Sequence, residues 1–261
     1  TEPKMRRQIG LFFTALQFFA RLPIPAWVGF EAAWLQQSVR YFVLVGVVLG
    51  CITAGSYYLF ALLWPQMVAV LLSTIVGILT TGAFHEDGFA DMCDGFGGGL
   101  SPARVLEIMQ DSRVGAYGAI GISLMLLLKC TLLASLPDAS VVAALLLAHP
   151  LSRLASTSLI WRLQYVRGEG KAKPLAEQMS HIEFVIALVT MVLVGLGLYY
   201  SLQLSWQALL LAGFAAGWAA VSMGRRMWRR LGGYTGDCLG ATQQVAEVAI
   251  YLALLACLPQ R

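Results

Sequence analysis

The acidic residues of this chain gather in one short stretch that directly follows an apolar segment. Only 14 of the 261 residues are Asp or Glu, so their clustering requires an explanation. The uncharged residues 66–84 lead into five polar side chains set among glycines: His85, Glu86, Asp87, Asp91 and Asp94. On a helix, spacings of four and three residues place the three aspartates on one face, where like charges repel. A divalent cation relieves such repulsion, and Mg²⁺ is bound by carboxylates together with substrate phosphates. The pattern therefore predicts that Asp87, Asp91 and Asp94 form a magnesium site that also binds phosphate.

Two further readings of this cluster concern helix capping and acid–base chemistry. Acidic side chains can cap a helix end, but a cap uses one of them and this stretch offers four. His85 fits equally well as a metal ligand, a base or a hydrogen-bond donor. A base that accepts a proton from a substrate hydroxyl must lie near the metal. We take His85, Glu86 and Asp111 as the candidate catalytic residues.

A second polar group follows at Asp111 and Arg113. Ser101 and Pro102 predict a helix start, because serine caps helices and proline suits the first helical position. The short helix ends at Asp111 and Arg113, and a guanidinium fork is a preferred partner of phosphate. Arg153 lies inside an apolar segment, where an arginine is costly and therefore indicates function; the alternative is a side chain that snorkels to the membrane surface. We predict that Arg113 and Arg153 bind the substrate.

Two other polar residues are expected to be structural, and one basic loop is open to two interpretations. Lys129 is expected to snorkel toward the membrane surface, and His149 to be a packing residue with a satisfied hydrogen bond. The basic loop 167–173 suits an anionic substrate, and it equally suits a loop on the cytoplasmic side of a membrane.

A third polar group lies near the C-terminus. A glycine-rich turn and a new helix start follow four arginines, Arg225, Arg226, Arg229 and Arg230. Such a turn can bind a phosphate or a sugar. Asp237 and Thr242 come next, in a segment whose packing requires no polar side chain, and we predict that both contact the substrate.

The composition places these polar groups in a membrane protein. The chain is 58% hydrophobic and 12% charged, against roughly 25% charged residues in soluble proteins. A helix crosses a bilayer with about 20 apolar residues. Seven segments qualify: 41–63, 66–84, 114–136, 139–161, two within 184–224 that separate at 201–205, and one at about 239–258. We predict an all-α, polytopic helical bundle in which residues 1–261 form a single membrane-embedded catalytic domain.

The ends of these segments predict the orientation of the chain. Lys and Arg are frequent in the segments 85–113, 162–183 and 225–238 and absent from the opposite turns. Because cytoplasmic loops carry the excess of Lys and Arg, the N-terminus and the three polar groups are expected in the cytoplasm. The same bias explains the net charge of +4, so no nucleic-acid partner is implied. The segment 8–20 is too short to cross and is expected to be an interfacial or re-entrant helix.

Three motifs in these groups resemble those of the cobalamin synthase family, the adenosylcobinamide-GDP ribazoletransferases of bacteria and archaea. They are G-x-F-H-x-D-G-x-A-D-x-x-D-G at 82–95, I-M-x-D-S-R-x-G at 108–115 and G-G-x-T-G-D-x-L-G-A at 232–241. The Arg-Leu-Pro-Ile-Pro of 21–25 and the Ser152-Arg153 pair are also similar to that family. The resemblance extends, in order, along the whole chain.

This resemblance implies a Mg²⁺-dependent, multi-pass enzyme of the bacterial inner membrane. Such an enzyme joins α-ribazole, or its 5′-phosphate, to adenosylcobinamide-GDP and releases GMP. A ribose hydroxyl attacks the phosphorus nearest the cobinamide, and Asp87, Asp91 and Asp94 would hold the ion or ions. The sequence leaves open whether one or two ions bind and whether the protein forms a homo-oligomer.

Two other functions compete with this one. A CDP-alcohol phosphotransferase acting on another lipid-like substrate shares the chemistry, but the second D-x-x-x-D of that family is absent, since only Glu107 and Asp111 follow Arg104. A cation transporter places its coordinating groups near the bilayer midplane, whereas these carboxylates are predicted at one membrane face.

Overall fold

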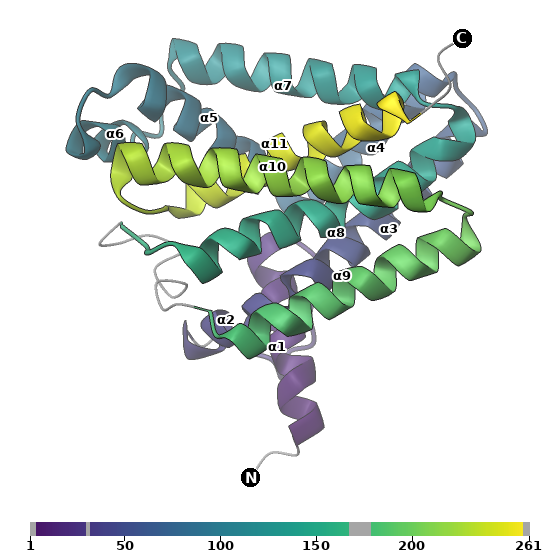
Figure 1. Ribbon diagram of the computed structural model, residues 1–261, viewed down its shortest axis with the longest axis horizontal. Helices are drawn as coiled ribbons and strands as arrows, with labels where there is room; N and C mark the ends of the chain where they lie inside the picture. The colour runs from purple at the N-terminus through teal and green to yellow at the C-terminus, as the bar shows by residue number, and fades with distance from the viewer. Residues whose placement is uncertain (1–3, 30–31, 167–178, 258–261) are drawn as a thin grey trace.

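The computed structural model describes residues 4–29, 32–166 and 179–257, and these form an all-helical bundle (Figure 1). In chain order the helices are α1 (Lys4–Phe19), α2 (Ala32–Ser38), the 3₁₀ helix η1 (Val39–Tyr41), α3 (Phe42–Ala61), α4 (Gln66–Thr81), α5 (Phe84–Gly98), α6 (Pro102–Ile108), α7 (Ala116–Ser135), α8 (Asp138–Arg162), α9 (His181–Ser201), α10 (Trp206–Leu231) and α11 (Gly236–Ala256). The predicted all-α architecture is confirmed. The basic loop 167–173 falls outside the described residues.

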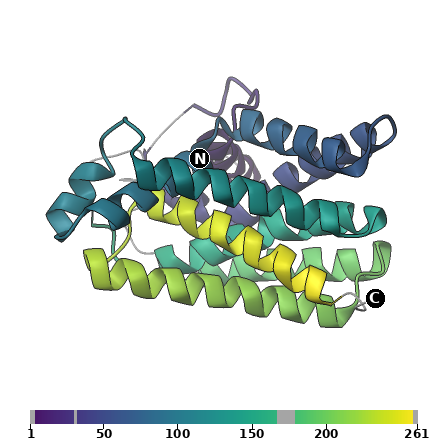
Figure 2. The ribbon, with the colours of Figure 1, turned by 90° about the horizontal axis from the view of Figure 1, so that it is seen from above.

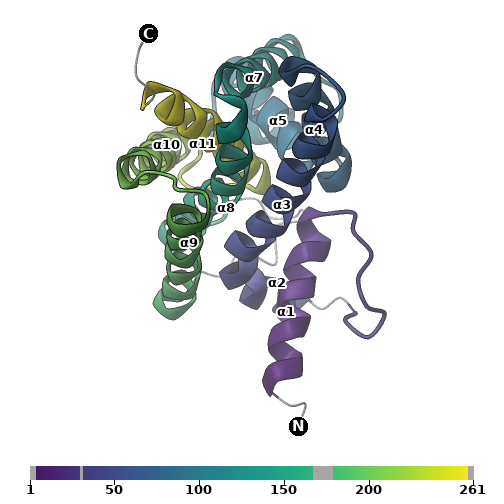
Figure 3. The ribbon, with the colours of Figure 1, turned by 90° about the vertical axis from the view of Figure 1, so that its right-hand side faces the viewer.

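The membrane spans agree with those expected from the sequence. Six helical stretches are long and apolar enough to cross a bilayer: Ala33–Ala61, Ala116–Ser135, Asp138–Arg162, His181–Ser201, Trp206–Leu231 and Gly236–Ala256. A seventh arises if α4 and α5, which are bent by 88° at the break between them, count as one. The helix expected within 8–20 is α1, whose 16 residues are too few to span. It runs across the direction of the long helices (Figures 1 and 3).

Glycines allow the central helices to pack closely. A Cβ added to Gly46 on α3 would lie 2.5 Å from the Cα of Pro150 and 2.7 Å from the carbonyl oxygen of His149, both on α8. A Cβ on Gly50 would lie 3.2 Å from the carbonyl oxygen of Leu145. Within a membrane, helices associate through such close van der Waals contact rather than through the hydrophobic effect. Of the candidate spans, α8 and α11 are the most buried.

All three motifs lie at one end of the bundle. The left-hand end in Figure 1 contains α6, the C-terminal ends of α8 and α10 and the first turns of α7 and α11. Seen from above, α7, α11 and α10 run side by side from this end to the other (Figure 2). The short turns at 62–65, 136–137 and 202–205 lie at the opposite end. This is the arrangement expected from the uneven distribution of Lys and Arg.

Thiol labelling tests the orientation directly. Gly98→Cys and Ser201→Cys, both at exposed positions of opposite ends, are introduced into a background whose exposed Cys51 and Cys257 are replaced by serine. In intact cells a membrane-impermeant maleimide should label the Ser201 variant. The Gly98 variant should react only after the membrane is permeabilised, because its end of the bundle carries the Lys and Arg residues. Labelling of the Gly98 variant from outside intact cells would show that the chain has the opposite orientation in the membrane.

Candidate active site

The acidic motif begins at a sharp corner in the chain. Gly82 and Ala83 both adopt left-handed backbone conformations, with φ of 65° and 59°, and these turn α4 into α5. An alanine in this region costs about 1–2 kcal/mol, so the surrounding structure must hold it there. One such restraint is the hydrogen bond from the Arg21 backbone N–H to the carbonyl of Thr80, at 2.7 Å. The corner carries His85 through Asp94 across the bundle end instead of along the span.

The first and third motifs contact each other through glycines. A Cβ on Gly88 of α5 would lie 2.9 Å from the Cα of Asp237, at the first turn of α11. A Cβ on Gly240 would lie 3.3 Å from the Cα of His85. At these two positions, α5 and α11 are too close for any side chain to fit between them. The contact brings Asp237 beside the acidic helix. A role of Asp237 in substrate binding requires such a position, and that role remains a prediction.

Asp94 joins the first motif to the end of the second. Its Oδ2 accepts a hydrogen bond from the Gly115 backbone N–H at 2.7 Å, and its Oδ1 accepts one from Gly118 at 2.8 Å. The side chain is 9% exposed, and the two amides belong to the start of α7. Asp94 therefore caps that helix, where a negative charge also complements the helix dipole. Its predicted role as a Mg²⁺ ligand remains a prediction.

We expect Asp94→Ala to destabilise the protein. A lost cap costs about 0.5–2 kcal/mol, and a buried carboxylate that accepts two N–H bonds should lie at the upper end of that range. Asp94→Asn keeps one side-chain acceptor, so its stability should lie between those of the wild type and Asp94→Ala. Thermal unfolding of the detergent-purified variants measures the effect. Wild-type stability of Asp94→Ala would refute the capping role.

Asp87 and Asp91 remain as the accessible carboxylates of the motif. Asp87 is exposed and Asp91 half-buried, and they lie one helical turn apart on α5. Asp91 is also three residues from Gly88, so it shares the helix face on which α11 begins. Among the described residues no group of three or more His, Cys, Asp or Glu side chains is placed to hold a metal ion. Two carboxylates nevertheless fit Mg²⁺, which typically completes its shell with water and substrate phosphates.

Asp111 and Arg113 form an exposed ion pair between α6 and α7, at the same end of the bundle. The Arg113 Nη2 donates to the Asp111 Oδ2 at 2.6 Å, and the Arg113 side chain is 88% exposed. Hydrogen bonds from Arg113 lower the pKa of Asp111 to about 2. A base works best when its pKa lies near the working pH, so this pairing disfavours Asp111 as the base. The guanidinium is free to exchange its carboxylate partner for a phosphate.

Arg153 and His85 lie inside the bundle. Arg153 is 1% exposed, and its Nη1 donates to the carbonyl of His149 at 2.9 Å. Its guanidinium carbon lies 5.8 Å from the centre of the Phe19 ring, on which His85 stacks at 5.4 Å. Within the described chain, neither the Nε of Arg153 nor the Nε2 of His85 has a hydrogen-bond partner, although both atoms are buried. Snorkelling is therefore excluded for Arg153.

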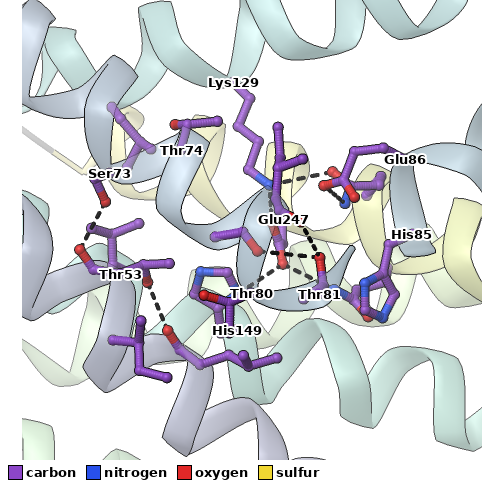
Figure 4. A pocket seen from close by; sticks show the side chains of 18 of the residues that line it. Thr53, Ser73, Thr74, Thr80, Thr81, His85, Glu86, Lys129, His149 and Glu247 are labelled. Atoms are coloured by element: carbon purple, nitrogen blue, oxygen red, sulfur yellow. Dashed lines mark hydrogen bonds and ion pairs between the residues drawn. The ribbon is translucent and has the colours of Figure 1, made fainter. Parts of the chain in front are cut away.

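The structure also reveals a buried polar cluster that the sequence analysis missed. Lys129 does not snorkel: its Nζ forms an ion pair with the fully buried Glu247, so that expectation is wrong. The Nδ1 of His149 lies 3.2 Å from the Oε1 of Glu247. Lys129 also donates to Gln244, which in turn donates to Glu86 at 2.9 Å (Figure 4). These side chains line a cavity of about 30 Å³, enough for one or two waters.

Two C-terminal candidates have structural partners. Thr242 is fully buried, and its hydroxyl donates to the carbonyl of Cys238 within α11 at 2.8 Å. The Arg230 Nη2 donates to the carbonyl of Gly99 at 2.5 Å, where it stabilises the C-terminal end of α5. Both interactions stabilise the helices that carry the site, and the predicted substrate contact of Thr242 remains a prediction.

Comparison with known proteins identifies the family. The sequence model of cobalamin-5-phosphate synthase matches residues 11–255. The chain belongs to the cobalamin-5-phosphate synthase family. Curated relatives named adenosylcobinamide-GDP ribazoletransferase include those of Shewanella frigidimarina (42% identity over 98% of this chain and 97% of the relative), Vibrio cholerae serotype O1 (43%, 97% and 95%) and Leptothrix cholodnii (44%, 94% and 95%). No solved structure matches the chain.

In this cobalamin-5-phosphate synthase family member, the motifs are held together by a close backbone contact and by the hydrogen bonds of one side chain. Gly88 packs against the start of α11, and Asp94 bonds to the start of α7. The polar cluster could have been anticipated from one signal, since Glu247 and Lys129 are opposite charges in two predicted spans. Charges in a bilayer are almost always paired, which makes each the natural partner of the other.

Proposed function

We propose that this protein is an adenosylcobinamide-GDP ribazoletransferase of the bacterial inner membrane, with its motif loops in the cytoplasm. The observation that carries the proposal is the convergence of three motifs at one bundle end, where Gly88 meets Asp237 and Asp94 meets Gly115. The printed names of relatives that cover nearly the whole chain support the same reaction.

The proposed reaction is a phosphoryl transfer. A ribose hydroxyl of α-ribazole, or of its 5′-phosphate, forms a bond to the phosphorus nearest the cobinamide. The bond from that phosphorus to the oxygen bridging to GMP breaks, and GMP leaves with the electron pair. The hydroxyl proton passes to a base, for which Glu86 and His85 remain the candidates. Such transfers depend mainly on positioning and on neutralising the pyrophosphate charge.

The carboxylates of α5 suit the ion that this chemistry needs. Bound Mg²⁺ would neutralise charge on the pyrophosphate during the transfer. Asp87 and Asp91 would hold the ion from one face of α5, with substrate oxygens as further ligands. Asp237, whose backbone packs against Gly88, lies next to the same face. Asp94 keeps α5 fixed relative to α7 through its two backbone hydrogen bonds.

Arg113, whose side chain is exposed, is our candidate for binding the pyrophosphate. A planar fork can make two parallel hydrogen bonds to phosphate oxygens, which lysine cannot. We expect Arg113→Lys to lower kcat/KM by roughly 10-fold or more, about 1.4 kcal/mol of transition-state binding. Arg104→Lys, which changes an exposed arginine of the neighbouring helix α6, should be nearly silent. If Arg113→Lys had the same kcat/KM as the wild type, the role of Arg113 would be structural, in its loop, and not in substrate binding.

One assay tests the function. Purified protein is supplied with adenosylcobinamide-GDP, α-ribazole and Mg²⁺, and the release of GMP is followed. A CDP-alcohol phosphotransferase would instead release CMP from a CDP-alcohol. Release of CMP without GMP would replace the proposal by that alternative.

A further inference from the structure

An aromatic pocket lies next to the acidic helix, between α1, α3, α5, α8 and α11. Four rings line it, those of Phe18, Phe19, Phe42 and Phe84, and its volume is about 20 Å³. Phe18 meets Phe84 at 5.2 Å between ring centres, and Phe19 meets Phe42 at 4.5 Å, both edge to face. Edge-to-face contacts of this kind are the preferred arrangement of aromatic rings. The lining of the pocket is therefore mainly aromatic, a surface on which a further ring can pack.

Two unsatisfied polar groups also line this aromatic pocket. Ser156 donates to the carbonyl of Leu239 and Gln243 donates to Glu247, so these polar lining residues are already engaged. His85 and Arg153 are 2% and 1% exposed, and the Nε2 of His85 and the Nε of Arg153 lack a partner among the described residues. An unpaired buried polar group costs about 1–3 kcal/mol. A ligand atom that accepts a hydrogen bond would remove this cost.

The lining of the pocket includes residues that adjoin those proposed for catalysis. Gly236, Leu239 and Gly240 from the first turns of α11 form one of its walls. Gly236 directly precedes Asp237, whose Cα lies against Gly88. From the other side, His85 is two residues before Asp87. A molecule with its ring in the pocket would therefore present its substituent where α5 and α11 meet, beside the carboxylates.

These features select one class of ligand. A lipid acyl chain would fill the apolar space but leave Arg153 and His85 unsatisfied. A guanine base carries several donors and acceptors on its edges, and a mostly apolar pocket would leave most of them without partners. A benzimidazole nucleoside is flat and apolar and has one ring nitrogen free to accept a hydrogen bond. The last of these matches the aromatic lining and offers an acceptor to one of the two unpaired groups.

We propose that the aromatic pocket binds the benzimidazole ring of α-ribazole, with the free ring nitrogen accepting a hydrogen bond from Arg153. This inference rests on the proposed function. The pocket in its present form is smaller than a bicyclic ring, so binding displaces the rings of Phe18 and Phe19 at the end of α1. Side-chain movement of this kind is common on binding. The ribose then emerges between α5 and α11, with its hydroxyl groups near Asp87 and Asp91.

Calorimetric titration of the detergent-purified protein with α-ribazole tests the proposal. Phe18→Ala removes a half-buried ring at the rim, and we expect the Kd for α-ribazole to rise at least about 10-fold. Phe18→Leu, which keeps apolar volume but no ring, should give a smaller increase. Phe13→Ala is the matched control, because Phe13 is a half-buried ring of the same helix that packs on Trp27 outside the pocket. Its Kd for α-ribazole should equal that of wild type.

Binding of adenosylcobinamide-GDP distinguishes a specific loss of α-ribazole binding from a general loss of structure. Its Kd should be unchanged in all three variants, which also shows that they are folded. Arg153→Lys should raise the KM for α-ribazole and leave the KM for adenosylcobinamide-GDP unchanged. The pocket assignment would be overturned if Phe18→Ala and Phe18→Leu bound α-ribazole with wild-type affinity. It would also be overturned if Arg153→Lys changed only the KM for adenosylcobinamide-GDP. In either case, GMP release by the wild-type protein would still uphold the proposed function. A wild-type protein that neither binds α-ribazole nor releases GMP would overturn both.

Discussion

Asp91→Ala should abolish GMP release, with a fall in kcat/KM of about 100-fold or more. Asp91 lies on the face of α5 that meets α11, and the proposed ion would lose one of its two proposed carboxylate ligands. Removing one stabiliser of developing charge typically costs about 10²–10³ in rate. Asp87→Ala should behave alike. Activity is measured at saturating α-ribazole over a range of Mg²⁺ concentrations.

The stability of the same variants distinguishes chemistry from folding. Removing one charge from a crowded acidic helix should leave thermal unfolding unchanged or slightly improved, since like charges one turn apart repel. Glu107→Ala, which removes an exposed carboxylate from α6 at the same bundle end, is the control and should keep both activity and stability. Near-normal turnover of Asp91→Ala at ordinary Mg²⁺ would refute the metal assignment.

Breaking the buried pair of Lys129 and Glu247 should have the largest effect on stability. Lys129→Met leaves the fully buried carboxylate of Glu247 without its ion-pair partner, and we expect the free energy of unfolding to fall by about 3–5 kcal/mol. Glu247→Leu should cost as much, because it leaves Lys129 and Arg153 as buried cations. Chemical denaturation in detergent micelles measures both losses.

A double variant shows whether pairing is the cause. Lys129→Met combined with Glu247→Leu replaces both charges by apolar side chains and should recover part of the loss, since such exchanges are often nearly neutral. The exposed pair Arg104 and Glu107, at 2.8 Å, is the comparison, and its removal should change stability by less than about 1 kcal/mol. Strictly additive losses in the double variant would show that the two charges are not coupled.

The sequence was sufficient for most of the spans and for the gathering of the motifs at one end of the bundle. Apolar length predicts a crossing helix, and the positions of Lys and Arg predict its direction, because both depend on composition alone. The break between α9 and α10 at 201–205 and the short helix after Pro102 were predicted for similar local reasons. Even the sharp corner before His85 falls at the expected end of a span.

The partners of single side chains could not be predicted in this way. The rotation of each helix depends on close contacts such as that of Gly46 with Pro150, which join residues far apart in the chain. The sequence therefore did not reveal that Asp94 turns toward the start of α7, or that Lys129 faces Glu247. Snorkelling was the natural expectation for a lone lysine, because its partner lies four helices later.

The corner at Gly82 and Ala83 has a consequence for the depth of the chemistry. With 16 residues, α4 rises about 24 Å, which is short of the roughly 30 Å hydrocarbon core of a bilayer. From this length we expect the start of α5 to lie below the lipid headgroups, where its polar groups must face protein or water rather than lipid. Substrates would then have to reach the carboxylates from the aqueous surface. Bilayer thickness thereby becomes a variable that we expect to control turnover, with thinner membranes giving easier access to the carboxylates.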